Sequence, residues 1–419
     1  MMAYLNFKNI VNALIVVVLS SMFFEDGLYF FVNYWGITLN SISMAALFLV
    51  MIAGLCVREN KFRIESESSF LFLVIYIYWT YSVFNSIYSL SFEDALFSIV
   101  KNFWYLVFFT IMFLYFQEFD RGRVKRLLNV SGFVSFWALI YFMCHQAFTG
   151  EMLRPEGYVG KFTLSPFLDY NMYVLMLCFS LIAMFFDLDK TRFKVFLYFC
   201  LVLLVLLVAI VVGSRRSIVF YVPLIVLFSL SFLRVQNFLL IMIVGFFASA
   251  SLLVLLHNSN YLESSMMEGV SERVDRALSV FDSGSNTSGT RITRWNDAVE
   301  ILSGADFFQL VIGLGQRSFY AFPEYIRYDG GKDYPHNFIL TAFFEGGIVK
   351  VFLIVFLISI YCVLAFQLPR RFSGYLLTFM GLWFLTALIS GEEFFMSKQI
   401  YIPFVFLAIF YLHRRDGRV

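Results

Sequence analysis

Long apolar stretches recur along almost the whole sequence, and they constrain the fold more than any other feature. A membrane-spanning helix needs roughly 20 mostly apolar residues, and segments near this length alternate here with short charged breaks. They lie at about residues 10–24, 41–57, 69–86, 97–116, 130–148, 168–186, 195–212, 217–233, 238–256, 347–366, 373–390 and 399–412. The sequence therefore predicts an all-α polytopic membrane protein with about 12 transmembrane helices.

Composition favours one membrane domain over several soluble ones. The chain of 419 residues is 60% hydrophobic and 14% charged, with a mean hydropathy of +0.79. The five cysteines all fall inside predicted spans, so they indicate neither a disulfide framework nor a metal motif. We expect residues 1–419 to form a single integral membrane domain without a metal site.

Lys and Arg residues are distributed unevenly between the two sides of this predicted bundle. With the N-terminus inside, the basic clusters at 58–63, 121–126, 190–194 and 414–418 also lie inside. The short outside loops carry few basic residues. Because short cytoplasmic loops carry an excess of Lys and Arg, both termini are expected in the cytoplasm.

One outside segment, residues 257–335 between the ninth and tenth predicted spans, is much longer than the other loops. Functional residues are expected to concentrate there. Apolar residues at helical spacing predict an amphipathic helix over about 266–281 and, after a flexible Gly/Ser tract at 282–289, a second one. The apolar stripe of the second helix consists of Ile292, Trp295, Val299 and Leu302.

Four groups of polar residues come to the outside of the membrane in this topology. They are Arg215 and Arg216 between the seventh and eighth spans, Arg291 and Arg294 in the first turn of the second loop helix, His336 and Asn337 at the start of the helix entering the tenth span, and Glu392 and Glu393 before the twelfth span. The acid pair Glu25 and Asp26 in the first outside loop is a weaker candidate. GLGQ at 313–316 is expected to be a turn, because it lacks the context of a nucleotide-binding fold.

The arginines suit a diphosphate group. The rigid guanidinium fork matches phosphate oxygens, and a helix N-terminus adds positive potential near Arg291 and Arg294. There are structural alternatives for both pairs. Arg215 and Arg216 could extend to lipid head groups, and Arg294 could pair with Asp297 or Glu300 on its own helix.

His336 suits a general base. Pro335 precedes it, as is typical of a helix start, where amide dipoles and neighbouring arginines disfavour the imidazolium form. A neutral imidazole facing a wet cavity can take a proton from a sugar hydroxyl, and Asn337 is a candidate to orient it. The alternative is that His336 caps the helix or makes a purely structural hydrogen bond.

Taken in chain order, several motifs resemble the O-antigen polymerase and O-antigen ligase superfamily of membrane glycosyltransferases. They are GSRRS after the seventh span, SGTRITRWNDAVEIL and VIGLGQRSF in the large loop, PHNFILTAFFEGGIV entering the tenth span, and RPEGYVGKF with DYNMYV in the third outside loop. Each motif is unspecific alone, but their order agrees over roughly residues 150 to 365.

The resemblance implies a helical bundle of the membrane glycosyltransferase C type in the bacterial inner membrane, with its active site in the periplasm. It implies metal-independent, cofactor-free transfer from a glycan carried on undecaprenyl diphosphate. The expected partners are this lipid-linked oligosaccharide, membrane lipid and a chain-length regulator protein, and no nucleic acid. The catalytic residues would be His336, Arg291 and Arg215, and the substrate-binding residues Arg216, Arg294, Asn337, Arg154 and Asn171.

Two other functions stay open. Ligases of this superfamily commonly carry a second histidine two positions before the His-Asn pair, where this chain has Tyr334, so the resemblance favours a polymerase over a ligase. A polysaccharide transporter is the alternative outside the enzyme class, because this topology is common among transporters. It is disfavoured because the polar residues cluster at one face, whereas transporters carry broken helices near the midplane.

Overall fold

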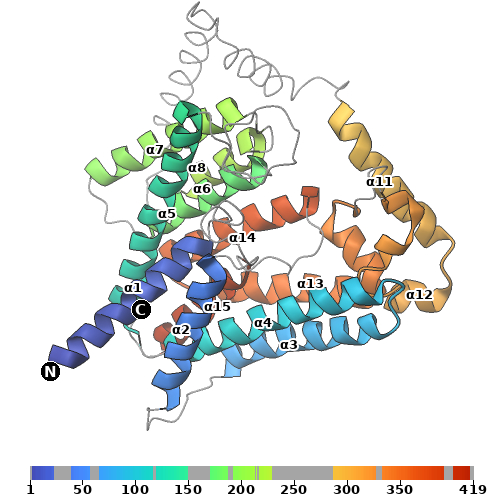
Figure 1. The fold of residues 1–419 in the computed structure, drawn as a ribbon, viewed down its shortest axis with the longest axis horizontal. Helices are drawn as coiled ribbons and strands as arrows, with labels where there is room; N and C mark the ends of the chain where they lie inside the picture. The colour runs from blue at the N-terminus through green and yellow to red at the C-terminus, as the bar shows by residue number, and fades with distance from the viewer. Residues whose placement is uncertain are drawn as a thin grey trace, which may run out of the picture. The chain divides into compact units, whose positions relative to one another are not determined.

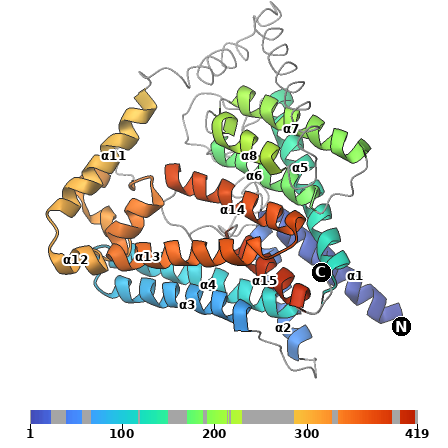
Figure 2. The same cartoon turned by 180° about the vertical axis from the view of Figure 1, so that it is seen from behind.

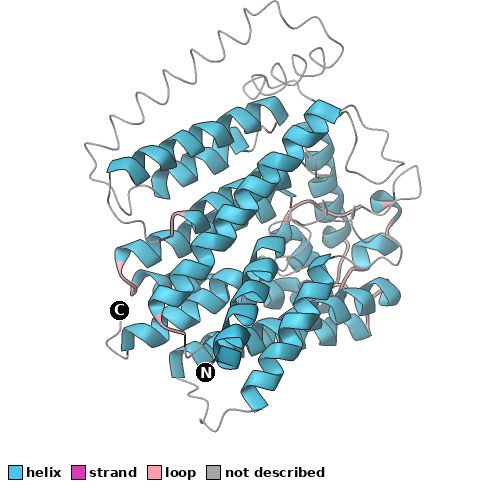
Figure 3. Cartoon of the chain, turned by 60° about the vertical axis from the view of Figure 1, so that its left-hand side comes forward, coloured by secondary structure: helices cyan, strands magenta, loops and turns pink. Residues whose placement is uncertain are grey.

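The computed structural model describes residues 2–22, 39–56, 66–116, 119–149, 170–186, 192–212, 214, 217–228, 286–326, 333–390 and 400–415. All regular secondary structure in these residues is helical (Figure 3). Within this described part of the chain, six helices are long and apolar enough to cross a membrane: Phe70–Ile87, Phe92–Phe116, Gly122–Gln146, Phe193–Val212, Phe338–Phe366 and Phe372–Ile389. The chain thus has the all-α architecture of a membrane protein.

Every predicted span except 238–256, which lies outside the described residues, overlaps a helix of the structure. Some of these helices are shorter than a full crossing, among them the apolar segments Asn171–Met184 and Tyr401–Tyr411. The number of twelve spans and the glycosyltransferase C type of bundle therefore stay predictions.

The chain divides into two compact units, which are described separately. The first contains α1 (Met2–Met22), most of α2 (Leu39–Cys56), α5 (Arg121–Thr149), α6 (Tyr170–Met184), α7 (Arg192–Val212), the π-helical turn η2 (Ser217–Tyr221), α8 (Val222–Phe228) and the first part of α14 (Arg370–Ser390). Helix α6 packs against α5 and α7 (Figure 1). Its residues 173–183 are all buried. Gly132 of α5 permits this close approach, since a Cβ there would lie 2.3 Å from the backbone nitrogen of Met184.

The second unit contains His336 and the helix that follows it. It contains α3 (Ser66–Ile87), α4 (Phe92–Phe116), α11 (Asn286–Ser303), α12 (Phe307–Ile312), the 3-10 turns η6 (Ser318–Ala321) and η7 (Pro323–Tyr325), α13 (Phe338–Phe366), the last part of α14 and α15 (Tyr401–Arg415). Helix α13 packs against α3, α12 and α15 (Figure 2). That the two units together form a single membrane domain stays a prediction.

Helix α13 is broken at Gly347, where the backbone has φ 60° and ψ −161°. The helix starts at Phe338, well before the predicted span of 347–366, which begins at this break. Donors from outside the helix bind the three preceding carbonyls: Leu314 N–H to Phe344 at 2.8 Å, Gly315 N–H to Glu345 at 2.9 Å and the Tyr81 hydroxyl to Gly346 at 2.8 Å. Carbonyls at the kink are thereby satisfied by tertiary contacts.

Helix α11 differs from its prediction in two respects. It begins at Asn286, inside the tract predicted to be flexible, so Arg291 and Arg294 lie beyond its first turn and the proposed effect of the helix N-terminus on them is wrong. The buried face of α11 also differs from the predicted apolar stripe, because Ala298 and Leu302 are buried whereas Val299 is 55% exposed. The helix predicted at 266–281 lies outside the described residues.

Candidate functional site

His336 and Asp333 lie side by side in the segment that leads into α13. Nε2 of His336 is 3.0 Å from Oδ1 of Asp333, which is hydrogen-bonding distance. The Asp333 side chain is 9% exposed and that of His336 is 23% exposed. The carboxylate is therefore nearly buried, while the imidazole keeps access to solvent. Such a hydrogen bond fixes the orientation and the tautomer of the ring.

Arg294 of α11 holds the second oxygen of Asp333. Its Nε is 3.1 Å from Oδ2 of Asp333, and its Nη1 is 3.5 Å from Oδ2 of Asp297. Nη1 also donates to the backbone carbonyl of Glu324. Arg294 therefore pairs with Asp297, as the structural alternative predicted, and also with a second carboxylate, that of Asp333. A phosphate group would compete with both carboxylates for this guanidinium, so substrate binding by Arg294 stays a prediction.

Tyr325 links this cluster to a packed core. Its hydroxyl donates to the backbone carbonyl of Arg294 at 2.8 Å, and its own carbonyl accepts from the N–H of Asp333 at 2.8 Å. Burial raises the pKa of the Tyr325 phenol, so the hydroxyl stays a neutral donor at physiological pH. The ring packs in an apolar cluster with Ala298, Leu302, Phe319 and Phe344. This core fixes α11 against the start of α13 and so fixes the distance between Arg294 and Asp333.

The backbone around His336 is unusual. His336 has a φ of 56°, in the left-handed region that non-glycine residues seldom occupy, and residues in such conformations concentrate at functional sites. The ring of Tyr334 lies 4.1 Å from the imidazole, centroid to centroid. His336 therefore stands just before the helix in a strained turn, where Asp333 and Tyr334 both contact its side chain.

Asn337 is the N-cap of α13. Its Oδ1 accepts hydrogen bonds from the N–H groups of Ile339 at 3.0 Å and Leu340 at 3.2 Å. Capping occupies the amide oxygen that was a candidate to orient His336, and Asp333 makes the orienting contact in its place. Asp333 is not among the residues predicted from the sequence, although its position three residues before His336 pointed to it.

Most of the other candidate residues lie outside the described part of the chain. Arg291 lies in α11, but its side chain is outside the described part of the chain, as are Arg154, Arg215, Arg216, Glu25, Asp26, Glu392 and Glu393. Asn171 belongs to the first unit, where its Oδ1 accepts from the hydroxyl of Ser214 at 2.9 Å. Asn171 is thus tied to the residue that immediately precedes Arg215 in the sequence. The convergence of these arginines with His336 stays a prediction.

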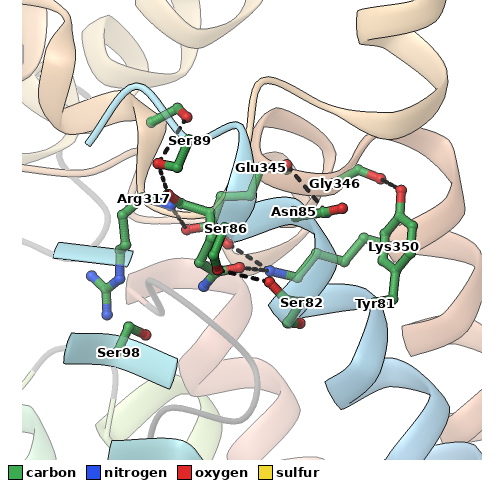
Figure 4. A network of polar contacts seen from close by, with 12 residues as sticks. Tyr81, Ser82, Asn85, Ser86, Ser89, Ser98, Arg317, Glu345, Gly346 and Lys350 are labelled. Atoms are coloured by element: carbon green, nitrogen blue, oxygen red, sulfur yellow. Dashed lines mark hydrogen bonds and ion pairs between the residues drawn. The ribbon is translucent and has the colours of Figure 1, made fainter. Parts of the chain in front are cut away.

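A second polar cluster lies buried where α3 meets α13 (Figure 4). Nζ of Lys350 is 2.6 Å from Oε2 of Glu345 and 2.7 Å from Oε1 of Gln316, and the side chains of Lys350 and Glu345 are 0% exposed. Oε1 of Glu345 accepts from the backbone N–H of Arg317 at 2.9 Å. This pair is not among the residues predicted from the sequence. Two opposite charges five residues apart inside an apolar helix were the signal that could have found it.

The cluster fastens the loop after α12 to both helices. The main-chain carbonyl of Asn85 in α3 accepts a hydrogen bond from the N–H of Gln316 at 3.2 Å. The side-chain amide nitrogen of Asn85 lies 3.4 Å from the main-chain carbonyl of Glu345. The hydroxyl of Tyr88 donates to the carbonyl of Ile312 at 2.7 Å. Main-chain and side-chain contacts thus hold α12, α3 and α13 in one arrangement.

The GLGQ turn is confirmed, and its glycines are required by close backbone approach. Gly313 and Gly315 have φ values of 84° and 103°. A Cβ on Gly313 would lie 2.3 Å from the carbonyl of Glu345, and one on Gly315 would lie 2.6 Å from Cα of Ser89. The turn therefore serves packing against α3 and α13.

Among the described residues, no group of three or more His, Cys, Asp or Glu side chains is arranged to hold a metal ion. Metal-independent chemistry stays a prediction. The helices and the two polar clusters together define an all-α membrane protein that carries a partly exposed His–Asp pair and a buried Lys–Glu pair. No protein-family model matches the chain, and no curated protein matches its sequence.

Proposed function

We propose that the protein is a membrane glycosyltransferase that polymerises oligosaccharide repeat units carried on undecaprenyl diphosphate. The observation that carries this proposal is the 3.0 Å contact between Nε2 of His336 and Oδ1 of Asp333, in a partly exposed position at the start of an apolar helix. The motifs that resemble the O-antigen polymerase and ligase superfamily support it, and Pro335-His336-Asn337 favours the polymerase.

His336 acts as the general base in the proposed reaction. Asp333 accepts a hydrogen bond from Nε2–H, so Nδ1 is the ring nitrogen left to act as the base. Nδ1 takes the proton of an acceptor sugar hydroxyl while that oxygen attacks the anomeric carbon of the donor. The bond between the anomeric carbon and the diphosphate breaks, and undecaprenyl diphosphate leaves with the electron pair.

Arginine residues stabilise the leaving group in this proposal. Arg215, Arg216 and Arg291 bind the diphosphate, because guanidinium groups pair bidentately with phosphate oxygens. Arg294 holds Asp333 through its Nε at 3.1 Å and thereby sets the position of the base. The energy for the new glycosidic bond comes from the sugar–diphosphate linkage, without nucleotide hydrolysis.

The proposed setting is the periplasmic face of a bacterial inner membrane, with both termini in the cytoplasm. A chain-length regulator protein is the expected protein partner. The ligase alternative differs only in the acceptor, which would be the lipid A core, and Arg154 and Asn171 are proposed to contact the glycan in either case.

One structural observation favours the transporter alternative. Discontinuous helices and buried ionisable residues are typical of transporter binding sites. Helix α13 is broken at Gly347 and carries the fully buried Lys350–Glu345 pair close to the break. Two observations count against this alternative. The break lies near the N-terminal end of α13, and donors from other segments bind the carbonyls at the break.

A reconstitution assay separates the three functions. Purified full-length protein is incorporated into phospholipid vesicles with lipid-linked repeat units, and the glycans are analysed by length. Longer glycans support the polymerase, and glycan transfer to added lipid A core without lengthening supports the ligase. Unchanged glycans that move across the bilayer would support the transporter and contradict the glycosyltransferase proposal.

A further inference from the structure

Helix α12 exposes two large aromatic side chains. Phe307 is 83% exposed and Phe308 is 66% exposed. The helix is well formed despite its length of 6 residues, because Asp306 and Gln309 make a reciprocal capping box at its start. Burying these two rings requires an apolar partner from outside the described residues of the chain.

The packing of α12 places it at the break in α13. A Cβ on Gly347 would lie 2.3 Å from the carbonyl oxygen of Val311 and 2.6 Å from that of Leu310, so the backbone of α12 lies directly against Gly347. The carbonyl of Ile312 accepts from the hydroxyls of Tyr81 at 3.3 Å and Tyr88 at 2.7 Å, near the end of α3. Figures 1 and 2 draw α12 beside the adjoining ends of α3 and α13.

The break in α13 coincides with a change in the exposure of its surface. Residues 338–347, all of them described, are buried or half-buried. Exposed apolar side chains begin immediately afterwards, with Ile348 at 59% and Phe352 at 63%. An apolar surface of this kind on a membrane helix faces lipid.

The length of α13 also places the edge of the bilayer at Gly347. The 29 residues of α13 extend about 43 Å at about 1.5 Å per residue, whereas the hydrocarbon core is about 30 Å thick. The apolar run ends at Phe366, before Arg370 and Arg371, and counting back roughly 20 residues from there reaches Gly347. On α3, the apolar span ends at Ile87, next to Tyr88. Both helices therefore place α12 at the level where the bilayer begins.

We infer that α12 is a membrane-interface helix whose Phe307 and Phe308 side chains insert among the lipids of the leaflet nearest the start of α13. Exposed apolar side chains also occur near the end of α3, with Phe84 at 51% and Ile87 at 72%. Under this inference, lipid contacts all three helices at this level. Aromatic rings at this depth anchor a protein segment to the bilayer interface. This lipid contact does not depend on the proposed glycosyltransferase activity.

Site-directed fluorescence tests the inference. The full chain, with its native cysteines replaced, carries a single cysteine labelled with the fluorophore NBD in vesicles of phosphatidylethanolamine and phosphatidylglycerol that contain doxyl-labelled phosphatidylcholine. The variants are Phe308→Cys, with Phe352→Cys as the lipid-facing control and Glu300→Cys, at an exposed polar position of α11, as the water-facing control. The label at 308 is expected to emit at shorter wavelength than at 300 and to be quenched by the doxyl lipids, as at 352.

Two outcomes would overturn the inference. Emission at 308 equal to that at 300 would place α12 in water, and blue-shifted emission without doxyl quenching would show that protein covers it. Should the cysteine replacements prevent folding, benzoylphenylalanine replaces Phe308 in the otherwise unchanged chain. Irradiation is then expected to crosslink phospholipid, as is also expected from the same substitution at Phe352, and crosslinking to protein alone would contradict the lipid contact.

Discussion

Asp333 binds His336 through one carboxylate oxygen, with 3.0 Å between Oδ1 and Nε2, and the two residues stand in the turn that leads into α13. The other carboxylate oxygen is held by Arg294 at 3.1 Å. The imidazole thus has a fixed ring orientation, with Asp333 as the hydrogen-bond acceptor for its Nε2–H. That is the arrangement a general base needs when it must use one particular nitrogen.

Asp333→Asn is expected to lower kcat by about 10²- to 10⁴-fold with little change in KM, because the amide no longer selects the tautomer with a basic Nδ1. The measurement is the initial rate of glycan lengthening in reconstituted vesicles. Asp297→Asn is the matched control, since Asp297 contacts the same arginine at 3.5 Å. Equal losses in both variants would show that Asp333 acts only through Arg294.

Lys350 and Glu345 are expected to depend on each other, because both side chains are fully buried and neither charge can turn to water. Lys350→Met and Glu345→Gln should each lower stability by about 3 to 5 kcal/mol, since each leaves one buried charge without its partner. The double variant should lose less than the sum of the two. Denaturant midpoints of the purified protein in detergent measure this coupling, and strictly additive losses would contradict it.

Gly347→Ala is expected to disrupt the contact between α12 and α13. An added Cβ would meet the carbonyl oxygen of Val311 at 2.3 Å, and the φ of 60° is itself unfavourable for alanine. Gly304→Ala is the control, because its nearest non-neighbouring atom would be 3.6 Å away. The thermal midpoint should fall clearly for Gly347→Ala and hardly change for Gly304→Ala. A similar midpoint for both would mean that the two helices separate easily.

Asn337→Ala should destabilise the start of α13 by about 1 kcal/mol, because it removes the acceptor for two backbone N–H groups. Asn337→Asp keeps a capping oxygen and should retain stability. Comparing glycan lengthening by the two variants separates capping from substrate binding. Full activity in Asn337→Asp would assign Asn337 to capping, whereas a folded but inactive Asn337→Asp would support its predicted contact with substrate.

Sequence patterns identify the apolar helices because hydrophobic length is a local property. They also single out His336, since an imidazole between Pro335 and Asn337 interrupts an apolar stretch. The partners of that histidine are harder to foresee. Arg294 reaches Asp333 across 39 positions, and only the packing of Tyr325 and its neighbours against α13 brings the two together.

Helix α11 shows how tertiary contacts override local preference. Asn, Thr, Ser and Gly at 286–289 favour loops because their side chains compete for backbone hydrogen bonds or, for glycine, because the backbone is too free. The structure nevertheless continues the helix through them. Ala298, a small residue outside the predicted stripe, is buried, whereas Val299 of that stripe is 55% exposed.

The kink at Gly347 likewise depends on distant residues. The sequence predicts a span that starts at 347, but it gives no sign that Leu314, Gly315 and Tyr81 bind the carbonyls there. Paired glycines at 346 and 347 are compatible with many structures. What selects the kink is the close approach of α12, which only glycine permits.

The most direct test of the account is glycan lengthening by His336→Ala in vesicles that contain lipid-linked repeat units, compared with the unaltered protein at matched folded content. The account predicts that the unaltered protein makes long polymers, whereas His336→Ala binds the lipid-linked donor and makes none. Long polymers from a folded His336→Ala protein, at a rate near that of the unaltered chain, would contradict the assignment of His336 as the base.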